Sequence, residues 1–312
     1  MLQYLIILLD DTSVSYCHYE NPRIERKLIS LENLKAGILF GMKENLMIQF
    51  IYPDYELPIE YQQTIEMIDH SKIMPSSKAD GADVVVFNNW DCLENSSLKE
   101  EIAYVLRTSK QELFENYTLL DKKTDMYRLN IVLTDIASFT EADFDRYKVI
   151  LSKLVGTIKR AYGNKKAPQI NILTDRMMLD KMNNCNAGWE NITLAPDGSF
   201  YVCPAFYFDG KAFPIGNLSD KLQIKNSQLY KLAYAPLCRK CDAYQCKRCI
   251  WLNWKTTLEV NTPSHEQCVV AHLERNASRK LLREVRMLGT FLPEKEIKEI
   301  DYLDPFDIKD EL

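Results

Sequence analysis

Residues 238–249 read Cys238-Arg239-Lys240-Cys241-Asp242-Ala243-Tyr244-Gln245-Cys246-Lys247-Arg248-Cys249, which is two CxxC pairs separated by four residues. Three further cysteines flank this block in the sequence. The seven cysteines between residues 185 and 268 are Cys185, Cys203, Cys238, Cys241, Cys246, Cys249 and Cys268. Thiolate is a soft ligand that suits zinc, copper(I) and iron–sulfur clusters, so this density indicates a metal site rather than disulfides.

The number of cysteines leaves two kinds of metal site open. A cuboidal iron–sulfur cluster takes four thiolates, so two clusters need eight and seven cysteines leave one position without a ligand. Zinc takes four thiolates, or three thiolates and one imidazole, and His265 and His272 flank Cys268. Of the two histidines, His265 is the better candidate for a missing ligand. An odd number of cysteines also argues against a closed disulfide framework.

Cys185 and Cys203 flank a predicted β-hairpin. Residues 192–195 form its first strand, Pro196-Asp197-Gly198-Ser199 is a turn of the Pro-Asp-Gly type, and residues 200–203 return as the second strand. A hairpin of this kind can bring two ligands to one metal. We therefore expect Cys185 and Cys203 to serve the same site.

Basic residues lie between the thiolates of the CxxC pairs. They are Arg239, Lys240, Lys247 and Arg248. Their positive charge would offset the charge of the thiolates and could raise the potential of a cluster. The alternative, which we favour from the sequence, is that they are solvated surface charges.

The composition is that of an ordinary globular protein, with 312 residues of which 46% are hydrophobic and 27% charged. The net charge of −5 gives no indication of nucleic-acid binding. The first residues, MLQYLIILLDD, lack a basic region before a short apolar run, so a buried strand is expected there rather than a signal peptide or a membrane span. We expect a cytoplasmic protein with reduced thiols and no membrane association.

The first 180 or so residues alternate between predicted strands and helices. Strands are expected at 4–9, 46–52, 84–87, 129–133 and 170–173. Helices are expected from Ser30, from Pro58 to about His70, over 96–119, and from a capping box at 138–141 to about Tyr162. This alternation predicts a parallel sheet with crossover helices, open or closed into a partial barrel, whose functional residues lie in the loops after the strands.

Three residues in these loops are candidate catalytic groups. Cys17 follows the first strand, where it is either a buried structural residue, a substrate-facing thiol or a metal ligand. Asp54 and Glu56 follow the second strand and are either an acid–base pair or turn carboxylates. Cys92 is expected to serve packing. No glycine-rich phosphate loop is present, so the sequence gives no local support for nucleotide binding.

The cysteine pattern, C-(x12)-G-(x4)-C followed by CxxC-x4-CxxC and a last cysteine, resembles the SPASM domain, with shorter central gaps than usual. SPASM domains carry auxiliary clusters at the C-terminus of many radical S-adenosylmethionine (SAM) peptide-modifying enzymes. The resemblance implies that Cys185, Cys203 and Cys249 hold a first [4Fe–4S] cluster. It implies that Cys238, Cys241, Cys246 and Cys268 hold a second. The fourth position of the first cluster would then be filled by an upstream residue, solvent or substrate.

The N-terminal part resembles the partial (β/α)6 barrel of the radical SAM enzymes but departs from it at the cofactor site. Those enzymes carry CxxxCxxC in the loop after the first strand. Counted back from Cys17, the other two positions are Val14 and Asp10. Valine has no donor atom and a carboxylate is a hard ligand, so neither replaces a thiolate there. The Gly-Gly-Glu-Pro after the second strand is likewise replaced, by residues 52–56. We therefore expect neither binding nor reductive cleavage of SAM in the ordinary way.

The whole chain resembles the CXXX-repeat peptide maturase family, in the stretches 4–19, 50–58, 194–198 and 203–206. The resemblance implies an α/β fold: a degenerate partial (β/α)6 TIM-like barrel over residues 1–183, a small Cys-rich SPASM-like iron–sulfur module over 184–275, and a helical acidic tail over 276–312. It also implies a ribosomally made Cys-x-x-x repeat precursor peptide and a partner modification enzyme.

Two roles follow from this resemblance. In the first, the protein is a catalytic maturase or redox subunit whose open cluster position takes a substrate thiolate. In the second, it is a non-catalytic recognition or scaffold subunit, possibly zinc-binding, for a partner radical SAM enzyme. Loss of the SAM-cluster cysteines favours the second role, whereas retention of all seven auxiliary ligands favours the first.

Overall fold

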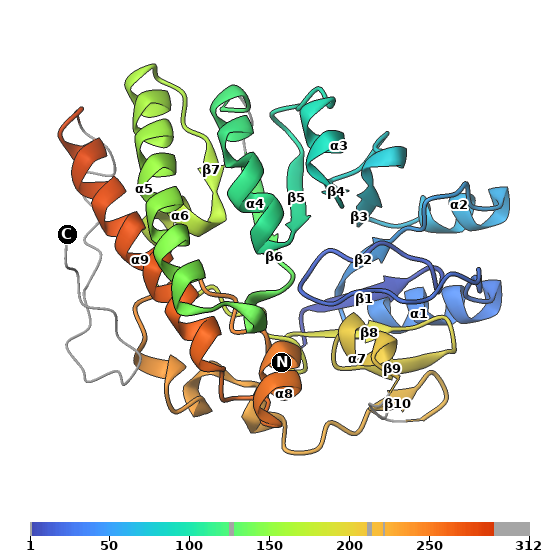
Figure 1. Cartoon of the computed structure of the whole chain (residues 1–312). Coiled ribbons are helices and arrows are strands. Elements are labelled where there is room, and N and C mark those ends of the chain that lie inside the picture. Colours follow the sequence, from blue (N-terminus) through green and yellow to red (C-terminus); the bar gives the residue numbers. More distant parts are fainter. Residues whose placement is uncertain (1, 125–127, 211–213, 221, 290–312) are drawn as a thin grey trace. The chain divides into compact units, whose positions relative to one another are not determined.

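The computed structural model describes the chain except residues 1, 125–127, 211–213, 221 and 290–312 (Figure 1). It contains two compact units. Unit 1 combines residues 1–86 with 186–234, and unit 2 combines residues 87–185 with 235–312. Because these units follow spatial contacts and each draws on two parts of the chain, the predicted division at 183 and 275 stays a prediction. The acidic residues of the predicted tail lie outside the described residues.

A sheet of mixed strand direction, with β1 (Tyr4–Leu8) at its middle, forms the centre of unit 1. Its strand order is β10-β9-β8-β1-β2-β3-β4. The other strands are β2 (Met47–Ile51), β3 (His70–Pro75), β4 (Val84–Phe87), β8 (Asn191–Leu194), β9 (Ser199–Tyr201) and β10 (Gly216–Asn217). Tyr4 pairs with Met47 on one side and with Asn191 on the other, both in parallel register. Leu5, Ile7 and Leu8 are fully buried, as expected of a strand covered on both faces.

The helices of unit 1 are α1 (Leu31–Lys43), α2 (Ile59–Ile65) and the short α7 (Pro204–Phe208). Ser30 caps α1 by accepting the Asn33 amide, as its place in the sequence predicts. Gly37 brings α1 against the sheet, because an added Cβ there would lie 2.3 Å from the Cδ2 atom of Leu194. The predicted hairpin is present: β8 and β9 pair antiparallel, and Gly198 occupies the turn with φ +81°.

Unit 2 combines three parallel strands with two long helices and several short ones. The strands are β5 (Ala103–Thr108), β6 (Arg128–Leu133) and β7 (Gln169–Ile170). The helices are α3 (Trp90–Glu94), α4 (Lys110–Asn116), α5 (Glu141–Gly163), α6 (Asn171–Met178), α8 (Ile250–Thr257) and α9 (His265–Arg286). Helix α9 packs along α5 and α6, so the C-terminal part of the chain supplies the cover of this unit (Figure 1).

Several predicted elements differ from the structure. The segment after Ile65 leaves its helix and forms β3, and the predicted helix over 96–119 contains the strand β5. Of the predicted last strand at 170–173, Ile170 ends the two-residue strand β7, and the rest is the start of α6. Helix α5 is present, but Thr140 and Asp143 form its capping box. The misread segments are short and mix apolar with charged residues, so strand and helix periodicities are hard to tell apart there.

Candidate functional site

The loop after β1 is the place where the sequence departs from a radical SAM enzyme. Asp10 is fully buried there. Its Oδ1 accepts the Thr12 amide at 2.8 Å and the Thr12 hydroxyl at 2.6 Å, and its Oδ2 accepts the Tyr55 hydroxyl at 2.8 Å. The Asp10 amide in turn donates to the Ser13 hydroxyl at 3.0 Å. Both carboxylate oxygens of Asp10 are therefore engaged by neighbouring residues of the chain.

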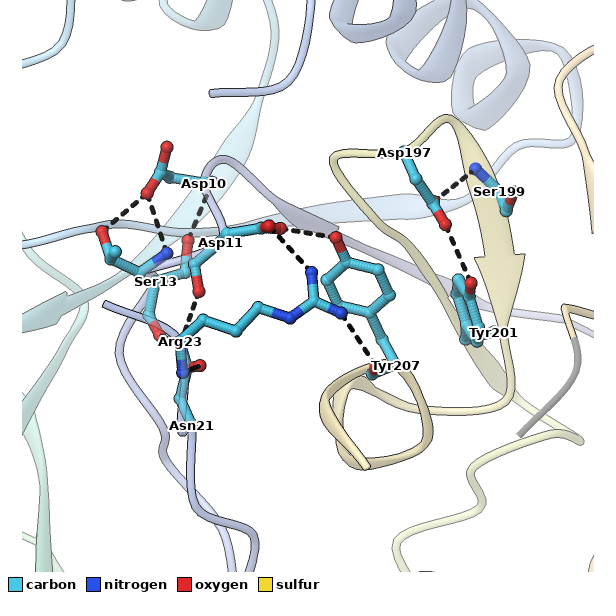
Figure 2. Close-up of polar contacts among 10 residues, drawn as sticks. Asp10, Asp11, Ser13, Asn21, Arg23, Asp197, Ser199, Tyr201 and Tyr207 are labelled. Carbon is cyan, nitrogen blue, oxygen red and sulfur yellow. Dashed lines mark hydrogen bonds and ion pairs between the residues drawn. The ribbon is translucent and has the colours of Figure 1, made fainter. Parts of the chain in front are cut away.

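Asp11, the next residue of the same loop, contacts Arg23 and Tyr207 (Figure 2). It forms an ion pair with Arg23 at 2.8 Å, and the Tyr207 hydroxyl donates to its Oδ1. The Arg23 guanidinium lies 3.9 Å from the centre of the Tyr207 ring and donates to the Tyr207 carbonyl at 3.3 Å. The Asn21 amide donates to the carbonyls of Asp11 and Ser13 at 2.7 and 3.0 Å. We call this set the β1-loop network: Asp10, Asp11, Thr12, Ser13, Asn21, Arg23, Tyr55 and Tyr207.

The tyrosines of the β1-loop network are held in their protonated form. Burial, together with the hydrogen bond to Asp11, raises the pKa of Tyr207 well above its ordinary value. Burial and the bond to Asp10 do the same to the pKa of Tyr55. Both hydroxyls therefore remain donors to carboxylates at every physiological pH. Because a tyrosine hydroxyl donates to each carboxylate, the consecutive residues Asp10 and Asp11 can both be buried.

The candidate catalytic residues lie in different surroundings. Cys17 is half-buried, whereas Asp54 is exposed. Glu56 is also exposed and forms an ion pair with Lys78. These positions agree with the alternative that Asp54 and Glu56 are turn carboxylates, and their catalytic assignment stays a prediction. Cys92 is exposed rather than packed in a core.

The CxxC block in unit 2 turns backbone amides toward sulfur, as its spacing predicts. The Ala243 amide donates to Cys241 Sγ at 3.4 Å, and the Arg248 amide donates to Cys246 Sγ at 3.4 Å. Burial, followed by the neighbouring Cys238, raises the pKa of the Cys246 thiol. A bound metal ion or cluster would take the thiolate and would supply the positive charge that such a buried site requires. The donor set and its N–H···S bonds therefore fit an iron–sulfur cluster.

Cys185 lies beside this block because residues 183–185 pair with residues 244–248. The Asn183 amide donates to the Tyr244 carbonyl at 2.7 Å, and the Cys185 amide donates to the Lys247 carbonyl at 3.0 Å. The Arg248 Nε donates to the Asn184 side chain at 2.7 Å. Unit 2 thus holds Cys185 together with the four cysteines of the block.

The last two cysteines are placed by other elements. Cys268 lies in the first turns of α9 in unit 2. Cys203 precedes α7 in unit 1, so its predicted association with Cys185 and Cys249 stays a prediction. In the parts of the chain that the structure describes, no group of three or more His, Cys, Asp or Glu side chains is arranged to hold a single metal ion.

Although the sequence favoured His265, His272 lies close to a candidate ligand. Its Nε2 lies 3.6 Å from Cys241 Sγ, and the residue is 1% exposed. His265, the predicted candidate, is half exposed and packs edge-on against Phe144. Spacing alone could not choose between them, because His265 lies three residues before Cys268 and His272 four residues after it, so both share its face of α9.

Asp242 fixes the loop between Cys241 and Cys246. It accepts from Arg176 of α6 at 2.9 Å and from Arg275 and Arg279 of α9 at 3.2 and 2.6 Å. Arg176 Nε also donates to the Asp242 carbonyl at 3.0 Å. Burial alone would raise the pKa of Asp242, but the three guanidinium groups outweigh it and hold that pKa below its usual value. This arrangement, which we call the Asp242 clamp, anchors the cysteine loop to two helices.

Glu274 is a second buried carboxyl near this loop. The Tyr147 hydroxyl donates to it at 2.8 Å, and the Gln245 side chain contacts it at 3.4 Å. Burial raises the pKa of Glu274 to about 7, although these two hydrogen bonds oppose the shift. Helix α9 therefore carries a carboxyl that is largely protonated below neutral pH.

Comparison with known proteins finds a family match over the cysteine-rich segment. Residues 185–250 match the SPASM family, described as an iron–sulfur cluster-binding domain. That stretch contains six of the seven cysteines, and Cys268 lies beyond it. A sequence comparison with curated proteins finds no match.

Two solved structures share the fold over almost the whole chain. Native anSMEcpe with bound AdoMet has a TM-score of 0.64 and 12% identity, and the match covers 92% of this chain and 100% of that one. Native anSMEcpe with bound AdoMet and Cp18Cys peptide has a TM-score of 0.63 and 13% identity, with the same coverage. At such identities the likeness concerns the fold. The predicted α/β fold of the radical SAM type, with a SPASM domain, is therefore confirmed.

The Asp242 clamp can be tested with Asp242→Asn. We expect the free energy of unfolding to fall by about 3 kcal/mol and metal content to drop, because a buried carboxylate shared by three arginines is lost. Asp121→Asn is the matched control, since Asp121 of the same unit pairs with Arg160 at a half-exposed site. It should cost about 1 kcal/mol or less. Equal melting curves for the two variants would contradict the clamp.

Glu274 gives the stability a dependence on pH. Its pKa is about 7 in the folded protein, against an ordinary glutamate value of 4.5, so the folded state binds more protons between these values. The contribution of Glu274 to the free energy of unfolding should therefore be largest below pH 4.5. It should fall by about 3 kcal/mol as the pH rises to 7. Glu274→Gln should remove this component. Other groups titrate alike in both proteins, so the difference between their unfolding free energies at pH 5 and pH 8 isolates Glu274. A difference that does not change with pH would refute the assignment.

Proposed function

We propose that this protein is an iron–sulfur subunit that takes part in maturing a ribosomally made Cys-x-x-x repeat precursor peptide, without cleaving SAM. The observation that carries the proposal is a contrast within the chain. All seven auxiliary cysteines are present in and just beyond the segment that matches the SPASM domain. The loop after β1, in contrast, has a single cysteine, and its two aspartates are engaged by Tyr55 and Arg23.

The proposed ligand sets are those that the resemblance implies. Cys185, Cys203 and Cys249 hold a first [4Fe–4S] cluster with one open position. The ligands of the second cluster are Cys238, Cys241, Cys246 and Cys268. Such clusters supply one-electron transfer and, at an open iron, a site for a thiolate. The chain contributes the N–H donors to sulfur and, through the Asp242 clamp, a fixed position for the loop between Cys241 and Cys246.

The residues at the two positions where further thiolates would be needed support the proposed absence of SAM cleavage. Val14 is buried, and its amide donates to the Tyr52 carbonyl. Asp10 already accepts from Thr12 and Tyr55 through both of its oxygens. Opening this site for a cluster would break a buried hydrogen-bonded network, at a cost of about 1–3 kcal/mol for each polar group left unpaired. The AdoMet bound in the compared structures therefore stays a property of those proteins.

The second candidate role is a non-catalytic recognition or scaffold subunit for a partner radical SAM enzyme. The observation that favours it is the closure of the β1 loop by the Asp10 and Asp11 contacts. In this role the thiolates could equally hold structural zinc. The peptide would then be bound without any change at the metal.

Metal content is the first test. After anaerobic purification we expect about eight irons and eight sulfides per chain, because two cuboidal clusters contain that number, together with a broad visible absorption band. Zinc and iron should be measured on the same sample. One or two zincs with little iron would overturn the iron–sulfur assignment and leave the scaffold role.

Addition of the precursor peptide separates the two roles. If the first cluster has an open position, a peptide with intact Cys-x-x-x units should change the electronic spectrum of the loaded protein. The same peptide with its cysteines replaced by serine is the control and should leave that spectrum unchanged. Binding of both peptides with no spectral change would favour the recognition subunit.

A further inference from the structure

Arg248 stands apart from the other basic residues of the cysteine block. Arg239 and Lys240 are exposed and Lys247 is half-buried, but Arg248 is 1% exposed. The expectation that all four are solvated surface charges is therefore wrong for Arg248. A guanidinium in such a position is costly to bury unless negative charge surrounds it.

The backbone and side chain of Arg248 are both fixed. Its φ of +43° lies in the left-handed region, which a residue with a side chain adopts at a cost of about 1 kcal/mol or more. In this conformation the Arg248 amide reaches Cys246 Sγ at 3.4 Å. The side chain is anchored where Nε donates to Asn184 at 2.7 Å, and Asn184 directly precedes Cys185. The guanidinium is thus held where the Cys185 segment meets the CxxC block.

Four of the seven cysteines act electrostatically on this guanidinium. They are Cys238, Cys185, Cys246 and Cys249. Burial lowers the pKa of Arg248, and each of these sulfurs raises it. An arginine stays charged in proteins even so. Arg248 directly precedes Cys249 of the first proposed ligand set, and its amide donates to Cys246 Sγ of the second, so one buried arginine adjoins both sets.

We propose that Arg248 is the internal counter-charge of the metal site, a positioning residue that raises the reduction potential of the clusters whose thiolates surround it. The inference rests on the proposed iron–sulfur function. Reduction adds an electron to the cluster. A fixed positive charge in a poorly solvated site stabilises that added negative charge far more than an exposed one does. Asn184 supports the effect by holding the guanidinium in place.

The experiment is a reductive titration of the metal-loaded, full-length protein with dithionite, followed by its visible spectrum. Arg248→Gln removes the charge and should lower the equilibrium constant for reduction at least tenfold, which is 59 mV for a one-electron couple. Arg248→Lys keeps a charge but loses the geometry of the Nε bond to Asn184, so its potential should lie between the two. Arg239→Gln removes an exposed charge from the same block and should leave the potential unchanged.

The outcomes distinguish this inference from the proposed function. Fully loaded Arg248→Gln with the wild-type potential overturns the inference and leaves the iron–sulfur function intact. Zinc in place of iron in the wild-type protein overturns the proposed function and this inference with it. If the Arg248→Gln protein does not assemble clusters, the Arg248→Lys protein provides the test. Cluster assembly in Arg248→Lys with near wild-type iron content supports a requirement for the positive charge. Failure of both variants shows that the shape of the side chain matters instead and overturns the inference.

Discussion

The shared carboxylate of Asp242 is the interaction on which the cysteine site of unit 2 depends. The loop between Cys241 and Cys246 has little regular structure of its own, so its position has to come from elsewhere. One buried carboxylate takes guanidinium groups from α6 and α9 and thereby ties the loop to the helices that cover the unit. Backbone amides then point at Cys241 and Cys246, as a cluster or a metal ion requires. Contacts within the protein chain therefore fix the position of this loop.

The cysteines of this chain are concentrated in the segment near its C-terminus and are nearly absent from the loop after β1. The segment that matches the SPASM domain carries six cysteines, whereas the loop after β1 carries one, Cys17. The fold in which such a loop sits is nevertheless kept, as the likeness to anSMEcpe shows. Buried carboxylates in the loop are compensated locally by Tyr55, Tyr207 and Arg23. Tyr207 belongs to α7, and Tyr55 and Arg23 belong to loops, so the strands contribute none of these compensating side chains.

Charge is balanced differently at the two places. In the β1-loop network the negative charge belongs to aspartates, and the chain supplies tyrosine hydroxyls and one arginine. In the cysteine site the negative charge belongs to thiolates, and the chain supplies amide N–H groups and the buried Arg248. Burial raises the pKa of Glu274 on α9 to about 7, so below neutral pH this carboxyl is largely protonated and adds no negative charge. Both patterns follow from one rule, that a buried charge needs a nearby partner or neutralisation.

The sequence by itself determined what depends on local spacing. The cysteine pattern predicts the SPASM domain, Gly198 predicts the hairpin turn, and the apolar run at 4–9 predicts the buried strand β1. Short elements of mixed composition, such as β3 and β5, were not predictable in this way, because burial on the sheet overrides their weak local preferences. Only the tertiary structure decided which polar residues meet. Arg176 lies 66 residues from Asp242, His272 lies 31 from Cys241, and Arg248 lies 64 from Asn184. Such pairings depend on how helices and loops pack, and periodicity along the chain does not record them.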